Sequence, residues 1–478
     1  MSTGTKTVRQ DAEKTYLKKK EKVGYCSAAG GQGAIYAIVT TFHTMFCVYE
    51  LGIDGVLLGS AMIFVRIWDA VNDPIMGTIV DRTRLKSGKM RPYLLFMPFL
   101  MALSTAALFL VPDSLGTGAK LAFSICGYLM WDLTYTITDV PFWGLPSAMT
   151  PNNSERAVFL SRARLFNSIG GALPYLLYLF ISDNKFKPGF LPTLLVMLVV
   201  FTVPFLLTYF VTTERIRVDE DEKKPGLGDN LHLLAQNKPL LLVGLFAILC
   251  FGRYMVQSAY GYAAASVFYS SNSTVDGMKS LLGAALIGAG MFPAMLAMPK
   301  LMRKFNYKQL AIGIALFGFV ADMIFFIVGM AVKFDLLPLL PFLFVSGIPL
   351  GAYNILIVAL VADCVDYLEW KTGKRAEGIC LAVNTFSSKL GSGIASAVMP
   401  FVLGMTSRLW GAEGFIAELP DGTEQSYKVK TVIFICLALV PSISMLLASI
   451  PMKWFKFVGA EKEKALKELN ERRVISEE

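Results

Sequence analysis

Acidic side chains recur at helical spacing inside apolar segments of this sequence, where charge is costly. The segment 66–74 reads RIWDAVNDP, so Arg66, Asp69 and Asp73 share one face of a helix and Asn72 lies beside it. Two carboxylates one turn apart repel each other unless a cation or a proton lies between them. Since sodium and lithium prefer oxygen ligands, Asp69 and Asp73 predict a site for sodium, lithium or a proton. The alternative is that Arg66 neutralises one acid and the group only locks helices together.

A second polar face is predicted on the segment 119–148, where Asp132, Thr136, Asp139 and Trp143 are spaced to lie together. A carboxylate accepts two hydroxyl hydrogen bonds, and an indole ring covers the apolar face of a sugar. Asp139 and Trp143 therefore predict a sugar-binding site. Asp132 is the weaker candidate, because a place near the outer end of the segment would leave it solvated.

Basic residues within later apolar segments suggest how the two groups are connected. Arg164 is expected to pair with Asp139 or to donate to a substrate hydroxyl, unless it only follows the excess of basic residues at cytoplasmic helix ends. Arg253 and Lys389 are the deep cations of the second half. A lysine at 389 that faces the acids of 66–74 would hold them together when no coupling ion is bound, which ties ion release to helix movement.

These charges need a membrane-spanning frame, and the composition predicts one. Of the 478 residues, 54% are hydrophobic and 17% are charged, whereas soluble domains average about 25% charged residues. A membrane helix needs about 20 consecutive apolar residues. Twelve such spans are predicted: 24–48, 56–80, 93–111, 119–148, 165–182, 190–212, 239–268, 280–299, 308–332, 336–362, 378–404 and 430–453.

Lys and Arg residues collect in alternate connecting segments, which sets the expected orientation. They are abundant in both terminal tails and in the segments 81–92, 213–238 and 300–308. By the positive-inside rule, both termini are expected in the cytoplasm of a multi-pass protein of the cell membrane. The net charge of +9 is therefore a topology signal, and no nucleic-acid partner is predicted.

The long polar segment 213–238 divides the predicted helices into two sets of six. Basic turns occur at matching places in the two halves, at 77–89 and at 299–305. Such a match is typical of a duplicated six-helix unit. We therefore predict an all-α membrane protein of the major facilitator superfamily fold. Its expected parts are an N-terminal tail (1–23), a first bundle (24–212), a connector (213–238), a second bundle (239–453) and a C-terminal tail (454–478).

The segments 66–77 and 135–143 resemble the glycoside–pentoside–hexuronide:cation symporters, the melibiose permease group of that superfamily. The runs RLFNS at 164–168 and VADCVDY at 361–367, followed by Lys389, extend the resemblance over essentially the whole chain. It implies a cation site formed by Asp69, Asn72, Asp73 and Thr136. It implies a sugar site formed by Asp139, Trp143, Arg164, Asn384 and Thr385. It also places Lys389 close to the cation site.

The sequence departs from melibiose permease at two positions, and both belong to the sugar site rather than to the cation site. Gln32 and Gly33 stand where that protein has a Lys-Asp pair whose acid binds galactose hydroxyls. Asn354, next to Tyr353, stands in place of a tryptophan. Cation coupling is therefore expected to be retained, whereas galactoside specificity does not follow from the resemblance.

The expected function is symport of a sugar or glycoside with sodium or a proton by alternating access, without a cofactor and as a monomer. One alternative is a carrier of lysolipids or other amphiphiles on the same fold. Another is a sensor that binds sugar without moving it. An enzyme is not expected, because the sequence shows no nucleophile–base pair, metal cluster or phosphate-binding loop.

Overall fold

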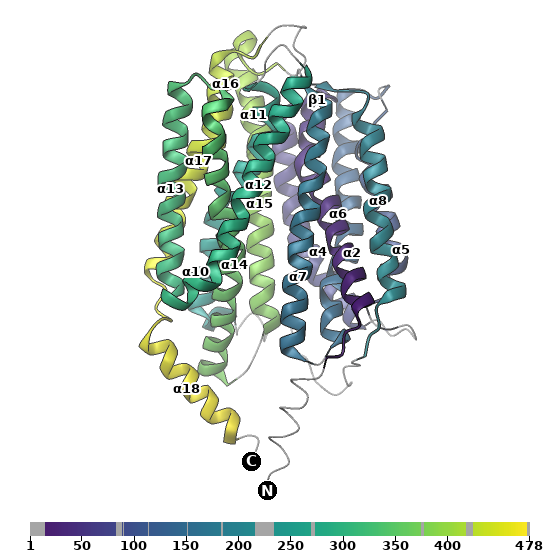
Figure 1. Cartoon of the computed structure of the whole chain (residues 1–478). Coiled ribbons are helices and arrows are strands. Elements are labelled where there is room, and N and C mark those ends of the chain that lie inside the picture. The colour runs from purple at the N-terminus through teal and green to yellow at the C-terminus, as the bar shows by residue number, and fades with distance from the viewer. Residues whose placement is uncertain are drawn as a thin grey trace. The chain divides into compact units, whose positions relative to one another are not determined.

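The computed structural model describes residues 15–82, 88, 90–112, 114–150, 152–182, 185–215, 234–268, 273–373, 377–416 and 424–475. Some side chains within these helices, among them Arg66 and Asp73, lie outside the description. The described chain is almost wholly helical (Figure 1). Contacts divide it into two compact units. Unit 1 holds 1–53, 67–181 and 185–222, and unit 2 holds 54–66, 182–184 and 223–478.

The elements up to residue 211 are α2 (Lys19–Ile38), the π-helix η1 (Val39–His43), α3 (Thr44–Tyr49), α4 (Gly55–Arg82), α5 (Tyr93–Ala107), α6 (Thr117–Met149), α7 (Asn153–Ala172), the 3₁₀-helix η2 (Leu173–Phe180), the short strands β1 (Ile181–Ser182) and β2 (Lys185–Phe186), and α8 (Phe190–Val211). The later elements are α10 (Lys238–Leu249), α11 (Gly252–Ser266), α12 (Ser273–Lys304), α13 (Tyr307–Ala331), α14 (Leu336–Thr372), α15 (Glu377–Trp410), the 3₁₀-helix η3 (Gly411–Glu413), α16 (Tyr427–Phe434), the π-helix η4 (Ile435–Leu439), α17 (Val440–Lys453) and α18 (Ala460–Ile475).

Many helices carry apolar side chains on their outer surface, as a bilayer requires. On α8, Val196, Val199 and Phe210 are each more than 60% exposed. Among the described residues, seven helical runs are long and apolar enough to cross a membrane, and two shorter apolar helices accompany them. The chain is therefore a multi-pass membrane protein.

Several helices extend beyond the spans predicted for them, and others are interrupted within those spans. The span predicted at 24–48 is α2, η1 and α3 in succession, and the span at 239–268 is broken between α10 and α11. α14 extends ten residues beyond its predicted end at 362 and stops before Gly373, whose φ of +71° is a left-handed conformation that favours glycine. The hydropathy of a segment locates its apolar core, whereas the helical backbone continues into polar ends.

α2 lies against α7 at a glycine-lined crossing that positions two site residues. A Cβ atom added to Gly170 would lie 1.9 Å from the carbonyl oxygen of Gly30, and one added to Gly33 would lie 2.2 Å from the carbonyl oxygen of Asn167. Only glycine permits the two backbones to approach so closely. The crossing brings Gln32 of α2 within hydrogen-bond distance of Asn167 of α7.

The Glu155 carboxylate, in the first turn of α7, connects that helix to the start of α2. Its oxygens accept hydrogen bonds from the backbone N–H groups of Tyr16 (3.0 Å) and Leu17 (3.2 Å) and from the Thr150 hydroxyl (2.9 Å). The Lys22 ammonium lies 3.0 Å away. Burial alone would raise the pKa of Glu155, but these hydrogen bonds lower it below its usual value, so the carboxylate stays charged at neutral pH.

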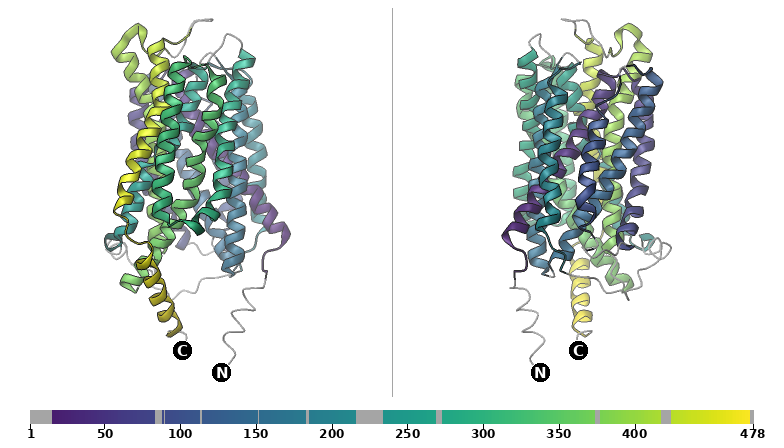
Figure 2. Two further views of the ribbon diagram at one scale, coloured as in Figure 1. Left: turned by 60° about the vertical axis from the view of Figure 1, so that its left-hand side comes forward. Right: turned by 90° about the vertical axis from the view of Figure 1, so that its right-hand side faces the viewer.

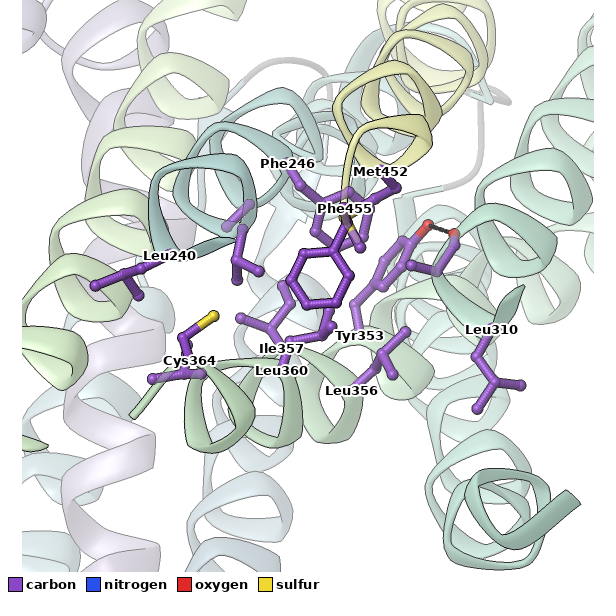
Figure 3. Close-up of a cluster of buried hydrophobic side chains, with 14 of the residues drawn as sticks. Leu240, Phe246, Leu310, Tyr353, Leu356, Ile357, Leu360, Cys364, Met452 and Phe455 are labelled. Atoms are coloured by element: carbon purple, nitrogen blue, oxygen red, sulfur yellow. Dashed lines mark hydrogen bonds between the residues drawn. The ribbon is translucent and has the colours of Figure 1, made fainter. Parts of the chain in front are cut away.

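Unit 2 has a core between α10, α14 and the end of α17. Leu240, Phe246, Leu356 and Phe455 are fully buried in it (Figure 3). Tyr353 lies among them, and its hydroxyl donates to the backbone oxygen of Ala311 at 3.2 Å. Tyr353 is therefore a packing residue of unit 2.

The segment predicted as a C-terminal tail contains a docked helix, α18, drawn in yellow in Figure 2. The Lys462 ammonium lies 2.7 Å from both carboxylate oxygens of Asp363 at the end of α14. The Trp370 indole N–H donates to Glu468 at 2.7 Å. On the inner face of α18, Leu469 is 2% exposed. The helix is therefore an integral part of unit 2.

Leu469→Ala is expected to destabilise unit 2, because truncating a buried leucine leaves a cavity and costs about 2–5 kcal/mol. The measurement is the melting temperature of the purified protein in detergent. Lys464→Ala is the matched control on the same helix, since that side chain is 70% exposed. Equal melting temperatures for the two variants would mean that α18 is not docked in solution.

Candidate functional site

A hydrogen-bond network in unit 1 centres on Gln32, which is 3% exposed. Its amide nitrogen donates to the Asp139 carboxylate and, at 2.6 Å, to the Tyr135 hydroxyl. Its amide oxygen accepts from the Asn167 amide at 2.5 Å, and Asn167 also donates to the backbone oxygen of Ala29 at 3.0 Å. We call Gln32, Tyr135, Asp139 and Asn167 the solute group. It connects α2, α6 and α7.

Arg164 and Trp143 lie beside each other at the cytoplasmic side predicted for these helices. The guanidinium carbon of Arg164 lies 3.7 Å from the centroid of the Trp143 ring, a cation–π contact. Trp143 is half-buried and Arg164 is exposed. The sequence suggested that Arg164 pairs with Asp139 or donates to a substrate hydroxyl. The contact with Trp143 is a third arrangement, which the sequence did not suggest. A sugar that stacked on this face of the ring would take the place of the guanidinium.

A second polar group, the ion group, is buried where α4 meets α6 in unit 1. Asn72 of α4 and Asp132 of α6 meet there, and we count with them Asp69 and Thr136, which lie about one turn away on the same two helices; all four are less than 5% exposed. The Asn72 amide nitrogen lies 3.3 Å from an Asp132 carboxylate oxygen. The predicted members Arg66 and Asp73 belong to the side chains outside the description. Oxygen atoms of this kind are the ligands that a hard monovalent cation prefers.

Asp132 and Gln32 are buried polar residues of these two groups that the sequence alone does not make leading candidates. The sequence allows Asp132 to be a solvated acid, yet it is 2% exposed and bonded to Asn72. In the sequence, Gln32 stands out only as a departure from melibiose permease, yet it is bonded to the three other side chains of the solute group. A single amide within an apolar segment gives no periodic signal that would identify it.

Three predicted residues lie on α15 in unit 2. Thr385 is exposed, and Lys389 and Asn384 are half-buried. The side-chain oxygen of Asn384 is inaccessible to water, and no residue that the structure describes donates a hydrogen bond to it. A buried acceptor without a donor is costly and is expected where a ligand supplies the donor. Asn354, in contrast, is exposed on α14.

Known proteins similar to this chain are transporters. The Bacillus subtilis protein "Uncharacterized symporter YnaJ" is 28% identical over 95% of this chain and 95% of its own length. The Escherichia coli "Glucuronide carrier protein homolog" is 25% identical over 95% of this chain and 96% of its own. The crystal structure of a D-xylose–proton symporter aligns with 94% of this chain and 99% of its own at a TM-score of 0.61 and 14% identity, which shows a shared fold.

The family described as "MFS/sugar transport protein" matches residues 24–457, which is most of the chain. This match and the solved structures confirm the predicted all-α major facilitator fold. The number of twelve membrane helices and their division into two bundles stay predictions. The predictions of transport rather than catalysis and of symport with a sugar are likewise confirmed. The chain belongs to the MFS/sugar transport protein family.

Proposed function

We propose that this protein moves a sugar or glycoside across the cell membrane together with sodium or a proton, with both termini in the cytoplasm and as a monomer. The observation that carries the proposal is that one helix, α6, contributes to both polar groups. Asp132 of α6 bonds to Asn72 of the ion group, and Asp139 of α6 bonds to Gln32 of the solute group. The two acids are seven residues apart, a rise of about 10 Å along the helix.

This arrangement supports direct coupling between cation and sugar. A cation bound by Asp69 and Asp73 would neutralise charge beside Asp132 and fix the helix that presents Asp139. A sugar bound by Asp139 would in turn fix the helix that presents Asp132 and Thr136. Such coupling is reciprocal, so the sugar must tighten the cation by the factor by which the cation tightens the sugar. The coupling roles of Lys389 and Arg66 stay predictions from the sequence.

The proposal is tested by uptake into vesicles that contain the purified protein. An imposed inward sodium gradient, or a proton gradient, is expected to drive accumulation of a labelled glycoside, and an ionophore that dissipates the gradient is expected to stop it. Asp73→Cys is expected to abolish gradient-driven uptake, because the ion site loses a ligand. Uptake and ion-dependent binding that both survive in this variant would contradict the assignment of the ion group.

A further inference from the structure

A membrane-spanning run of unit 2, Lys238–Ser266, is broken near its middle. Its first half, α10, ends at Leu249, and its second half, α11, begins at Gly252 (Figure 1). No proline occurs between residues 240 and 266, so the break is not caused by a missing backbone N–H. A break without proline has another cause, and one such cause is a side chain that enters the helical hydrogen bonds.

Two helical hydrogen bonds are replaced at the break. In a continuous helix, the Gly252 N–H would donate to the carbonyl of Ile248. The Leu249 carbonyl would likewise accept from the Arg253 N–H. Instead, the Arg253 N–H donates to the Cys250 carbonyl at 3.1 Å, only three residues back. The Gly252 N–H and the Leu249 carbonyl therefore need other partners, as buried backbone groups do.

One side chain of α17, Ser444, takes the place of both hydrogen bonds. Its hydroxyl accepts from the Gly252 N–H at 2.8 Å and donates to the Leu249 carbonyl at 2.5 Å. The side chain is buried, with 2% of its surface exposed. Ser444 therefore satisfies one backbone group from each half of the broken helix and connects both halves to α17.

The backbones of α11 and α17 approach each other closely at this contact. A Cβ atom added to Gly252 would lie 2.7 Å from the Cα atom of Pro441 and 2.7 Å from the Cβ atom of Ser444, so only glycine fits there. α17 is irregular at the same level, because the π-helix η4 ends at Leu439, two residues before Pro441. Short irregular stretches inside long helices often mark hinges or functional sites. Two such stretches meet at Gly252.

We propose that Ser444 is a positioning residue for transport, which fixes the break between α10 and α11 to α17, so that both halves of the broken helix move together with α17. The inference rests on the proposed function, because transport by alternating access requires helices to move as rigid groups. The one hydroxyl proton of Ser444 is donated to Leu249, so Ser444 has none to donate to a sugar. Ser444 therefore governs the rate of the conformational change and not the affinity for the sugar.

Ser444→Ala tests the proposal through the separation of rate from affinity. The measurements are the maximal rate of gradient-driven uptake into vesicles and the dissociation constant at equilibrium, with radiolabelled methyl glucoside, methyl galactoside and methyl xyloside as probes. The maximal rate is expected to fall about 10-fold, which is a usual effect of losing a buried hydrogen bond. The dissociation constant should change less than about 3-fold, as for most substitutions away from a binding hot spot.

Hydrogen exchange reports on the break directly and needs no sugar. In Ser444→Ala the Gly252 N–H loses its acceptor, so the peptide that covers residues 249–256 is expected to exchange at least about 10-fold faster than in the wild type. The measurement is mass spectrometry of the purified protein in detergent. Equal exchange in the two proteins would show that Ser444 does not hold the break, which would overturn the proposal.

Ser449→Ala is the matched control on α17. Ser449 is 5% exposed, and its hydroxyl donates to the Leu446 carbonyl of its own helix at 2.7 Å. The same atom is removed without loss of a bond between helices, so rate and exchange should match the wild type.

Ser444→Cys separates the hydrogen bonds from the volume of the side chain, and it keeps that volume if the alanine variant does not fold. A thiol occupies similar space but is a weak donor and a weak acceptor, so the maximal rate is expected to fall as in Ser444→Ala. A wild-type rate in Ser444→Cys would assign any effect of Ser444→Ala to packing and would overturn the proposal.

The inference and the proposed function fail in different ways. If the wild type takes up a glycoside and Ser444→Ala takes it up at the same maximal rate, the inference fails while the proposed function stands. If the dissociation constant rises in Ser444→Ala as much as the rate falls, Ser444 acts on the sugar site and the inference is overturned. If the wild type neither binds nor takes up any of the three glycosides, the proposed function fails together with the inference.

Discussion

Asp139→Asn is expected to weaken sugar binding on the order of 100-fold, because a carboxylate that accepts hydroxyl hydrogen bonds contributes about 1.5–3 kcal/mol per charged hydrogen bond. The fold should be unaffected. The asparagine oxygen can still accept the hydrogen bond that Gln32 donates to Asp139. The measurement is the dissociation constant for a labelled glycoside at saturating sodium, compared with the melting temperature of the same preparation.

Thr138→Val is the matched control for this prediction. Thr138 is fully buried one residue away on α6, and its hydroxyl donates to the Thr134 backbone oxygen of the same helix. A change there disturbs α6 without touching the solute group, so the dissociation constant should change less than about 3-fold, as for most substitutions away from a binding hot spot. If both variants lost affinity equally, the effect of Asp139→Asn would reflect the helix rather than the carboxylate.

Asp69→Asn is expected to abolish the dependence of sugar binding on the cation. Asp69 is 4% exposed within the ion group, and a monovalent cation held by carboxylates loses most of its attraction when one of them becomes neutral. The dissociation constant for the glycoside should then be the same with and without sodium. The measurement is binding of a labelled glycoside over a range of sodium concentrations and, separately, of pH.

Asp322→Asn is the control that separates a coupling acid from any buried acid. Asp322 is 1% exposed on α13 and accepts a hydrogen bond from the Ser346 hydroxyl at 2.5 Å, outside both polar groups. The asparagine oxygen can accept the same bond, so cation dependence should be kept. If Asp322→Asn lost the dependence of sugar binding on the cation and Asp69→Asn kept it, the coupling site would have to be assigned to unit 2.

Spacing in the sequence was enough to predict which side chains share a helix face. Asp69 and Asn72 on α4, and Asp132, Thr136 and Asp139 on α6, follow from a helical period of 3.6 residues. The membrane-spanning helices could be predicted too, since a run of about 20 apolar residues is the length that a helix needs to cross the bilayer. The roles of individual residues in coupling and sugar binding stay predictions.

Spacing could not predict which face of one helix meets which face of another. The contact between Asn72 and Asp132 joins residues 60 positions apart, and that between Gln32 and Asp139 joins residues 107 positions apart. Both depend on where helices cross, and the crossing of α2 with α7 depends on close contacts at Gly30, Gly33 and Gly170. Glycine is frequent throughout membrane helices, so its sequence positions do not identify the crossing partner.

The sequence by itself determined that this protein is a bundle of membrane helices with acids at membrane depth, because hydropathy and helical period are local properties of the chain. Only the tertiary structure decided that Gln32 joins the solute group and that Asp132 belongs to the ion group. Whether a buried polar atom finds a partner depends on side chains from distant segments, and their meeting is set by packing.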